Sequence, residues 1–199
     1  MKNKELLDYF FEINKIKDVK RYSIYHEVFK ESVADHSFLM TVLATKFVDE
    51  LKLDDLDFKK VIKLIMHHDF GEIGMVADFN TSLASVDKAY SAHKETVELE
   101  NINALSNKHG KEIFDLYNEY TAQQTREAKF VKALDKLEAT IYIMMRGAEY
   151  LTDAHLAAIF PIEAVKNFPE LIPFLKELQT HMKLEYTKAG HEWKKEYEI

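Results

Sequence analysis

Glycine and proline are scarce in this chain, and their scarcity constrains the fold more than any other feature of the sequence. Only 5 Gly and 3 Pro occur among 199 residues, although 47% of the residues are hydrophobic. A protein with many strands needs turn residues at each reversal of the chain, and here they are few. The chain is also long enough to bury a substantial core as one domain. We therefore predict an all-α fold with a single domain over residues 1–199.

Charge and cysteine content exclude several classes of function. The formal net charge is -7, whereas a protein that grips a nucleic-acid backbone needs a concentrated basic surface, so we expect no nucleic-acid polymer as partner. The chain has no cysteine, so any metal must be bound by His and carboxylate side chains. The first residues lack the apolar core of a signal peptide, and no segment has the length of a membrane span. We expect a cytoplasmic protein without a membrane partner.

Apolar periodicity predicts helices along most of the chain. Ser32 is a candidate N-cap for a helix that reaches about Leu51. The other predicted helices cover about Leu6–Ile13, Leu56–His68, Ala89–Asn107, Ile113–Tyr120, Thr125–Tyr150 and Phe174–Tyr186, and loops are expected over Lys17–Lys30 and Met75–Ser85. The apolar stripes of these helices predict buried positions that include Phe38, Leu39, Val42, Phe58, Leu99 and Met145.

The sequence His67-His68-Asp69 lies where the helix that starts near Leu56 ends, and Glu72 follows about one turn later. An isolated His-Asp pair is ordinarily structural, with the His capping or packing and the Asp solvated. Here the buried stripe of the helix continues into the pair, and a carboxylate on a buried face needs a partner such as a cation. His67 should point about 100° away from His68 around the helix, so we leave it out of the site.

His36 and Asp135 repeat this pattern in two other predicted helices. Leu39 and Met40 follow His36 at spacings that share its face, and Asp135 follows Val131 by about one turn. A lone His on such a face is as often a core residue hydrogen-bonded to the backbone as a ligand. Three helices that each offer a His or a carboxylate at an apolar face are, however, typical of metal sites inside helical bundles.

The candidate metal ligands are therefore His36, His68, Asp69 and Asp135. Two imidazoles and two carboxylates suit Mn, Co, Fe or Zn better than Ca, and the sequence does not select among these four metals. Such a ligand set also leaves coordination positions for water and for a substrate oxygen.

Three segments of the chain resemble the HD superfamily of metal-dependent phosphohydrolases. They are Glu31-Ser32-Val33-Ala34-Asp35-His36-Ser37, His68-Asp69-Phe70-Gly71-Glu72 and Lys132-Ala133-Leu134-Asp135-Lys136-Leu137-Glu138. Their order and context are similar to the 5′-deoxynucleotidase branch of that superfamily, from Arg21 to about Glu149. The resemblance implies an HD-domain helical bundle with a metal site between helices, a core over about 21–150 and a helical extension over about 151–199.

The resemblance also implies roles for individual residues. Glu72 would handle protons and Arg21 would contact the substrate, whereas without the resemblance Arg21 would be interpreted as a surface charge. The implied reaction is hydrolysis of the 5′-phosphate of (deoxy)nucleoside monophosphates, and the implied assembly is a homodimer. Metal binding is implied for His36, His68, Asp69 and Asp135, of which Asp69 would also act with Glu72 in catalysis.

The sequence departs from that branch at two places near the expected substrate. Tyr22 follows the arginine where tryptophan is typical, and Met75-Val76-Ala77-Asp78-Phe79 replaces a Gly-Asp followed by prolines. Asp78 is the candidate for the aspartate that contacts the sugar. The expected substrate-binding residues are thus Arg21, Tyr22 and Asp78, and a preference for deoxyribose stays open.

Two other functions are compatible with the same residues. One is hydrolysis of cyclic nucleotides or of nucleoside tri- or pyrophosphates, because the same metal scaffold accommodates those esters. The other is a non-catalytic helical module that senses a nucleotide or binds a partner and retains the ligands for stability. The presence of Glu72 argues against this last alternative.

Overall fold

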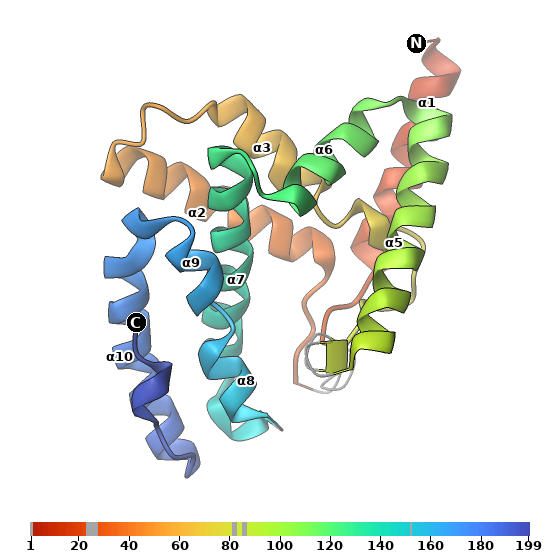
Figure 1. Cartoon of the computed structure of the whole chain (residues 1–199). Helices are drawn as coiled ribbons and strands as arrows, with labels where there is room; N and C mark the ends of the chain where they lie inside the picture. Colours follow the sequence, from red (N-terminus) through yellow and green to blue (C-terminus); the bar gives the residue numbers. More distant parts are fainter. Residues whose placement is uncertain (1, 23–27, 81–82, 85–86, 152) are drawn as a thin grey trace. The chain divides into compact units, whose positions relative to one another are not determined.

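The structure, a computed structural model, describes residues 2–22, 28–80, 83–84, 87–151 and 153–199, and over these residues it contains helices and no β-strand. The all-α prediction is confirmed. No helix in this part of the chain combines the length and apolar character needed to cross a membrane. The α-helices are α1 (Asn3–Ile13), α2 (Val33–Leu51), α3 (Phe58–His67), α5 (Lys88–His109), α6 (Glu112–Ala122), α7 (Arg126–Arg146), α8 (Ala154–Ile159), α9 (Ile162–Lys166) and α10 (Ile172–Ala189) (Figure 1). The short 3₁₀ helices are η1 (Asn14–Asp18), η2 (Phe70–Glu72), η3 (Ala148–Tyr150), η4 (Pro169–Leu171) and η5 (Lys195–Tyr197).

The chain divides into two compact units. The first unit comprises residues 1–38 and 62–122, and the second comprises residues 39–61 and 123–199. The first unit therefore holds α1, the start of α2, the end of α3, η2, α5 and α6. The second unit holds the rest of α2, the start of α3 and the helices from α7 to α10. The organisation as a single domain stays a prediction.

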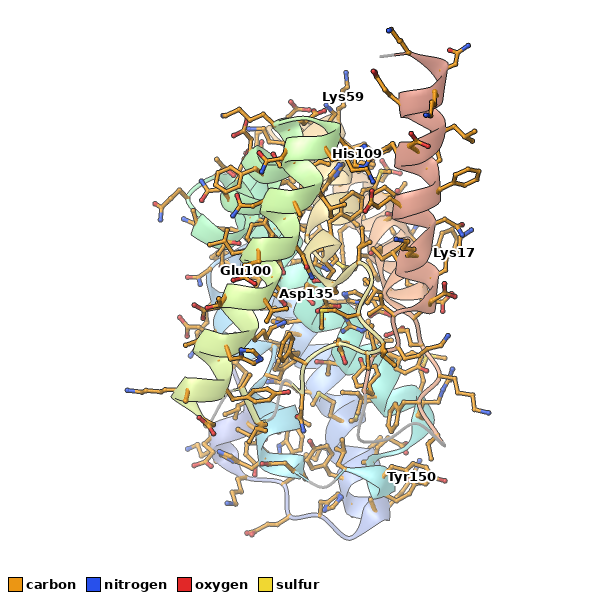
Figure 2. The ribbon with its side chains drawn as sticks, turned by 90° about the vertical axis from the view of Figure 1, so that its right-hand side faces the viewer. Lys17, Lys59, Glu100, His109, Asp135 and Tyr150 are labelled. Atoms are coloured by element: carbon orange, nitrogen blue, oxygen red, sulfur yellow. The ribbon has the colours of Figure 1, made fainter. Side chains whose placement is uncertain are left out.

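The core of the first unit forms where α5 packs against η2 and α6. Helix α1 lies beside α5 (Figure 1), and Glu12 on α1 forms ion pairs with Lys108 and His109. Figure 2 shows His109 at the end of α5 that adjoins α1. The buried residues of this core are Phe70, Ile73, Ile102, Leu105 and Ile113, and Tyr9, Ile13, Ile16, Phe114 and Tyr117 pack against them.

Helix α2 begins with a capping box. The Ser32 hydroxyl accepts a hydrogen bond from the Asp35 backbone N–H at 3.2 Å, and the Ser32 backbone N–H donates to the Asp35 carboxylate at 3.0 Å. These bonds satisfy donors that a helix start otherwise leaves unpaired. The prediction of Ser32 as N-cap is confirmed, and the cap fixes the helical turn that carries His36.

The core of the second unit is formed by α10 with α7, η3 and α9. Helix α7 begins at the N-cap Thr125, whose side chain accepts a hydrogen bond from Ala128 N–H. Gln179 on α10 donates to the Tyr197 carbonyl and accepts from Ile199 N–H, which holds the last residues against the helix. The buried members of this core are Met144, Ala148, Ala158, Met182, Tyr186 and Tyr197.

Several predicted positions are wrong in detail. The predicted helix over 125–150 ends at Arg146, because Gly147 has φ +113, a backbone conformation that L side chains rarely adopt. Leu83 and Ala84 are helical although a loop was expected there. Helices α8 and α9 lie within the helical extension expected over about 151–199 but were not predicted individually. Of the two expected loops, residues 23–27, 81, 82 and 85 lie outside the described part of the chain.

Some of the predicted buried positions on α2 are also wrong. Its buried face follows Val33, His36, Met40 and Ala44 at helical spacing, so side chains on the opposite face point outward. Phe38, for example, is 68% exposed. The same correction applies to Leu39, Val42, Phe58, Leu99 and Met145, which are all exposed.

Replacing Tyr197 with Ala should lower the free energy of unfolding by about 3–5 kcal/mol, because a buried ring is lost and a cavity remains. Tyr197 is 2% exposed, whereas Tyr150 is 42% exposed, so Tyr150→Ala serves as control and should cost under about 1 kcal/mol. Urea denaturation of the three proteins measures both values. Equal losses of stability in the two variants would contradict the conclusion that Tyr197 is part of the core of the second unit.

Candidate metal centre and active site

His36, His68 and Asp69 converge in the first unit. His36 lies in the first turns of α2, and His68 and Asp69 directly follow the last residue of α3. One ligand atom from each of the three lies within 4.8 Å of the others, and the two imidazole rings are 5.5 Å apart. Both histidines are buried. The arrangement is that of a compact metal-binding cluster.

The orientation of the His68 ring suits a metal ligand. His68 Nδ1 lies 2.7 Å from the Ile65 carbonyl oxygen. Because a carbonyl only accepts, Nδ1 carries the proton and donates, which leaves the lone pair on Nε2. His68 Nε2 is 3.0 Å from Asp69 Oδ2. An imidazole lone pair and a carboxylate at this distance repel each other unless a cation or a proton binds to them. The donor set therefore fits a divalent metal.

Arg21 is held beside this cluster. Its Nε forms an ion pair with Glu31 Oε2 at 3.1 Å, and its Nη1 lies 3.5 Å from Asp69 Oδ2. The Arg21 backbone N–H also donates to the Glu31 carbonyl at 3.0 Å. The guanidinium Cζ is 5.4 Å from the centroid of the Tyr22 ring, and Tyr22 has φ +58. Arg21 is therefore an anchored guanidinium next to the candidate ligand Asp69, and not a surface charge.

Glu72 is a buried acid on the adjoining turn η2. Burial, and after it the nearby Asp69 carboxylate, raises the pKa of Glu72 well above its ordinary value. Lys94 on α5 acts in the opposite direction, with its Nζ 3.6 Å from Glu72 Oε1. A buried carboxyl with a raised pKa is the kind of group that serves as a general acid or base in enzymes.

Asp78 lies on the segment that passes next to Lys20. The Asp78 backbone N–H donates to the Lys20 carbonyl at 2.9 Å, and Ala77 forms an isolated β-bridge with the same residue. Since Arg21 directly follows Lys20, these contacts hold Asp78 close to the Arg21 segment. Burial raises the pKa of Asp78 to about 6, although Arg21 acts to lower it.

Asp135 belongs to the second unit. It is buried on α7 (Figure 2), and its Oδ2 lies 3.4 Å from Lys132 Nζ and 3.1 Å from Lys136 Nζ. Lys136 Nζ also lies 4.3 Å from the Phe160 ring centroid. The two lysines balance the charge of the buried carboxylate. That Asp135 completes the metal site stays a prediction.

The sequence reasoning assigned no role to Glu31 or Lys94, although both contact site residues. Glu31 is buried and fixes Arg21, and it stands directly before the cap of α2, which was the available signal. Lys94 gave no signal, because it lies in a helix that is polar on most sides. His67 stacks on Phe70 at 4.4 Å and contacts the Lys63 carbonyl through Nδ1 at 2.8 Å.

Asp78→Asn should stabilise the protein at pH 8. The pKa of about 6 in the folded state exceeds the unfolded value of about 4, so the ionised carboxylate destabilises the fold increasingly as the pH rises through 6. Removal of the charge should therefore add up to about 2 kcal/mol at pH 8 and almost nothing at pH 4. Thermal unfolding at both pH values measures the difference. Asp54→Asn, at an exposed position, should have no effect, and a gain for Asp78→Asn at pH 4 alone would contradict the assignment.

Comparisons with known proteins agree with this geometry. The family model of the HD domain matches residues 13–167. The chain is 34% identical to 5′-deoxynucleotidase HDDC2 of Dictyostelium discoideum, with 75% of this chain and 79% of the relative covered. It is 28% identical to 5′-deoxynucleotidase HDDC2 of Homo sapiens, with 95% of this chain and 92% of the relative covered. A conserved hypothetical protein from Pyrococcus furiosus has a similar fold, with a TM-score of 0.69 and 24% identity over 87% of this chain and 99% of that chain. The chain therefore belongs to the HD domain family of metal-dependent phosphohydrolases and is related to 5′-deoxynucleotidases over most of its length.

Proposed function

We propose that this protein hydrolyses the 5′-phosphate of (deoxy)nucleoside monophosphates. The observation that carries the proposal is the convergence of His36, His68 and Asp69 beside an anchored Arg21 and a buried Glu72. Metal ligands, a guanidinium and a buried acid are the groups that phosphate-ester hydrolysis requires. Relatives of this chain are named 5′-deoxynucleotidases, which supports a mononucleotide as substrate.

The metal would be held by His36, His68, Asp69 and Asp135. Such a cation, when bound, supplies Lewis acidity that activates water and polarises a phosphoryl oxygen. The ligand mixture of imidazole and carboxylate supports Mn, Co, Fe or Zn. Within this set, the hydrogen bond from His68 Nδ1 to the Ile65 carbonyl orients the ring and directs Nε2 toward the metal position.

Glu72 would transfer the proton. Its buried carboxyl has a pKa raised well above the ordinary value, which favours the protonated form that would donate to the departing sugar oxygen. The ionised form would accept a proton from the attacking water. Glu72 lies in η2, three residues after Asp69, so the acid and the candidate ligands His68 and Asp69 belong to one short segment.

Arg21 would bind the phosphate. Its pairing with Glu31 fixes the guanidinium before substrate arrives, and a fixed fork of N–H donors suits phosphate oxygens better than a flexible lysine does. Tyr22, against the same guanidinium, and Asp78, beside Lys20, would contact the sugar. Asp69 would serve both as a ligand and in placing the reacting water.

The test is phosphate release from a panel of nucleotides with the purified protein. We expect hydrolysis of 5′-monophosphates, deoxy and ribo, with added Mn²⁺ or Co²⁺, and loss of it after chelation. Elemental analysis of the protein identifies the native metal. Hydrolysis confined to cyclic nucleotides or to tri- or pyrophosphates would show that the substrate class is wrong. A metal-loaded protein that hydrolyses no ester would favour a non-catalytic nucleotide sensor.

Asp135→Ala should abolish both metal binding and turnover, because a metal site with one carboxylate removed loses charge and a ligand. Titration with Mn²⁺ and phosphate release measure the two effects. Asp49→Ala is the matched control, since Asp49 is an exposed acid on α2. If Asp135→Ala retains full metal content and turnover, Asp135 is not part of the site.

Glu72→Gln should keep the metal while kcat falls by about 100-fold or more, because only the proton-transfer group is lost. Metal content and kcat are measured on the same preparation. Glu100→Gln is the control, because Glu100 is exposed on α5 (Figure 2). A variant with the wild-type rate would show that Glu72 takes no part in the reaction.

A cytoplasmic location and a homodimer stay predictions. The location is expected from the sequence, and the homodimer is implied only by the resemblance to the deoxynucleotidase branch. Analytical ultracentrifugation of the purified protein determines the oligomeric state.

A further inference from the structure

Helix α5 packs directly on the turn η2 that carries Glu72. Gly71 makes this approach possible, because a Cβ built at Gly71 would lie 2.9 Å from Glu98 Cβ and 3.1 Å from Glu98 Cα. Real Cβ atoms essentially never lie that close to another atom, so a side chain at position 71 would force η2 and α5 apart. The distance between the helix and the backbone next to Glu72 is therefore set by the absence of a side chain.

A hydrogen bond from α5 fixes the same backbone. Asn101 Nδ2 donates to the Gly71 carbonyl at 2.7 Å. Asn101 lies three residues after Glu98 and seven after Lys94, so the three side chains share one face of α5. This face of α5 is polar although it packs on η2. Lys94 and Asn101 on this face contact Glu72 and Gly71 in η2.

Lys94 is the member of this face that reaches the carboxyl group. Lys94 Nζ lies 3.6 Å from Glu72 Oε1 and forms a second ion pair with Glu98. The Phe79 ring, with its centroid 5.5 Å from Nζ, contacts the ammonium as well. An ammonium in such a mostly buried place is costly unless its partners compensate for lost water. The contacts hold Nζ between two carboxyl groups.

The two oxygens of Glu72 have different surroundings. Oε1 faces Lys94, whereas Oε2 is buried and has no hydrogen-bond partner among the residues that the structure describes. An unpaired buried carboxyl oxygen is costly, and it is the atom from which a proton can be exchanged with a reactant. The geometry thus separates a restrained oxygen from one that can react.

We propose that Lys94 is a positioning residue for Glu72, which holds Oε1 so that Oε2 is directed at the reacting atoms. The inference rests on the proposed phosphohydrolase function, in which Glu72 exchanges the proton. Glu98 forms an ion pair with the Lys94 ammonium on its other side. Asn101 and Gly71 fix the backbone of the turn that carries the Glu72 side chain. Lys94 contacts Glu72 and is not among the candidate metal ligands, so we expect its effect on the reaction to pass through Glu72.

The test compares Lys94→Met and Lys94→Gln with Lys94→Arg. The two neutral variants should lose about tenfold to 100-fold in kcat, less than a lost general acid costs, with KM and metal content almost unchanged. Lys94→Arg should restore most of kcat, because it keeps the positive charge. Lys88→Met is the control, since Lys88 is exposed at the start of the same helix. Circular dichroism and melting temperature verify that each variant is folded.

A double-mutant cycle with Glu72→Gln separates positioning from general structure. If Lys94 acts through Glu72, Lys94→Met should cause no further loss of kcat in the Glu72→Gln protein. Full additivity of the two changes would overturn the proposal. So would a neutral variant with wild-type kcat, or an arginine variant as slow as the neutral ones.

The same measurements distinguish failure of this inference from failure of the proposed function. The cycle is run on whichever ester the wild type hydrolyses best. A preference for cyclic nucleotides or triphosphates would refute the mononucleotide substrate. The Lys94 variants, compared on the preferred ester, would still test the positioning role of Lys94. A wild-type protein that hydrolyses no ester with Mn²⁺ or Co²⁺ would overturn both proposals.

Discussion

The short distance between His68 Nε2 and the Asp69 carboxylate is the constraint on which the site depends. The residues are neighbours in the chain at the end of α3, and the hydrogen bond of His68 Nδ1 to the Ile65 carbonyl prevents the ring from turning away. Two electron-rich groups in a poorly solvated place attract positive charge strongly. His36 adds a further imidazole to this cluster, and the Arg21 guanidinium lies on one side of Asp69. The fold thus brings candidate metal ligands together before any metal binds.

The groups around this cluster act in different ways on its neighbouring acids. Glu31 is paired with Arg21. Burial raises the pKa of Glu72 and of Asp78, and the lysine and arginine nearby limit the rise. Desolvation of this kind favours the protonated form of a carboxyl group, which is how proteins prepare such a group for proton transfer.

The sequence was sufficient for the long helices and for the motifs that resemble the family. Long periodic stretches such as α5 and α7 were predicted within a few residues at most of their ends, and Ser32 was identified as a cap from its residue type. The side of α2 that is buried could not be inferred, because Phe38, Leu39 and Val42 are apolar on the opposite side from Met40 and Ala44, and tertiary partners decide between them. Lys94 was missed for a related reason. Periodicity detects apolar faces, whereas this residue matters through one charge contact that only the packing of α5 on η2 creates.

Because Gly71 has no side chain, the position of α5 and the position of the Glu72 carboxyl depend on each other. The backbone of α5 at Glu98 approaches Gly71 so closely that only a hydrogen atom fits between them. Glu72 is the next residue in the chain after Gly71. Substitutions on the face of α5 that contacts η2 should therefore displace the Glu72 side chain. Position 71 should tolerate little variation, because any side chain there would collide with Glu98.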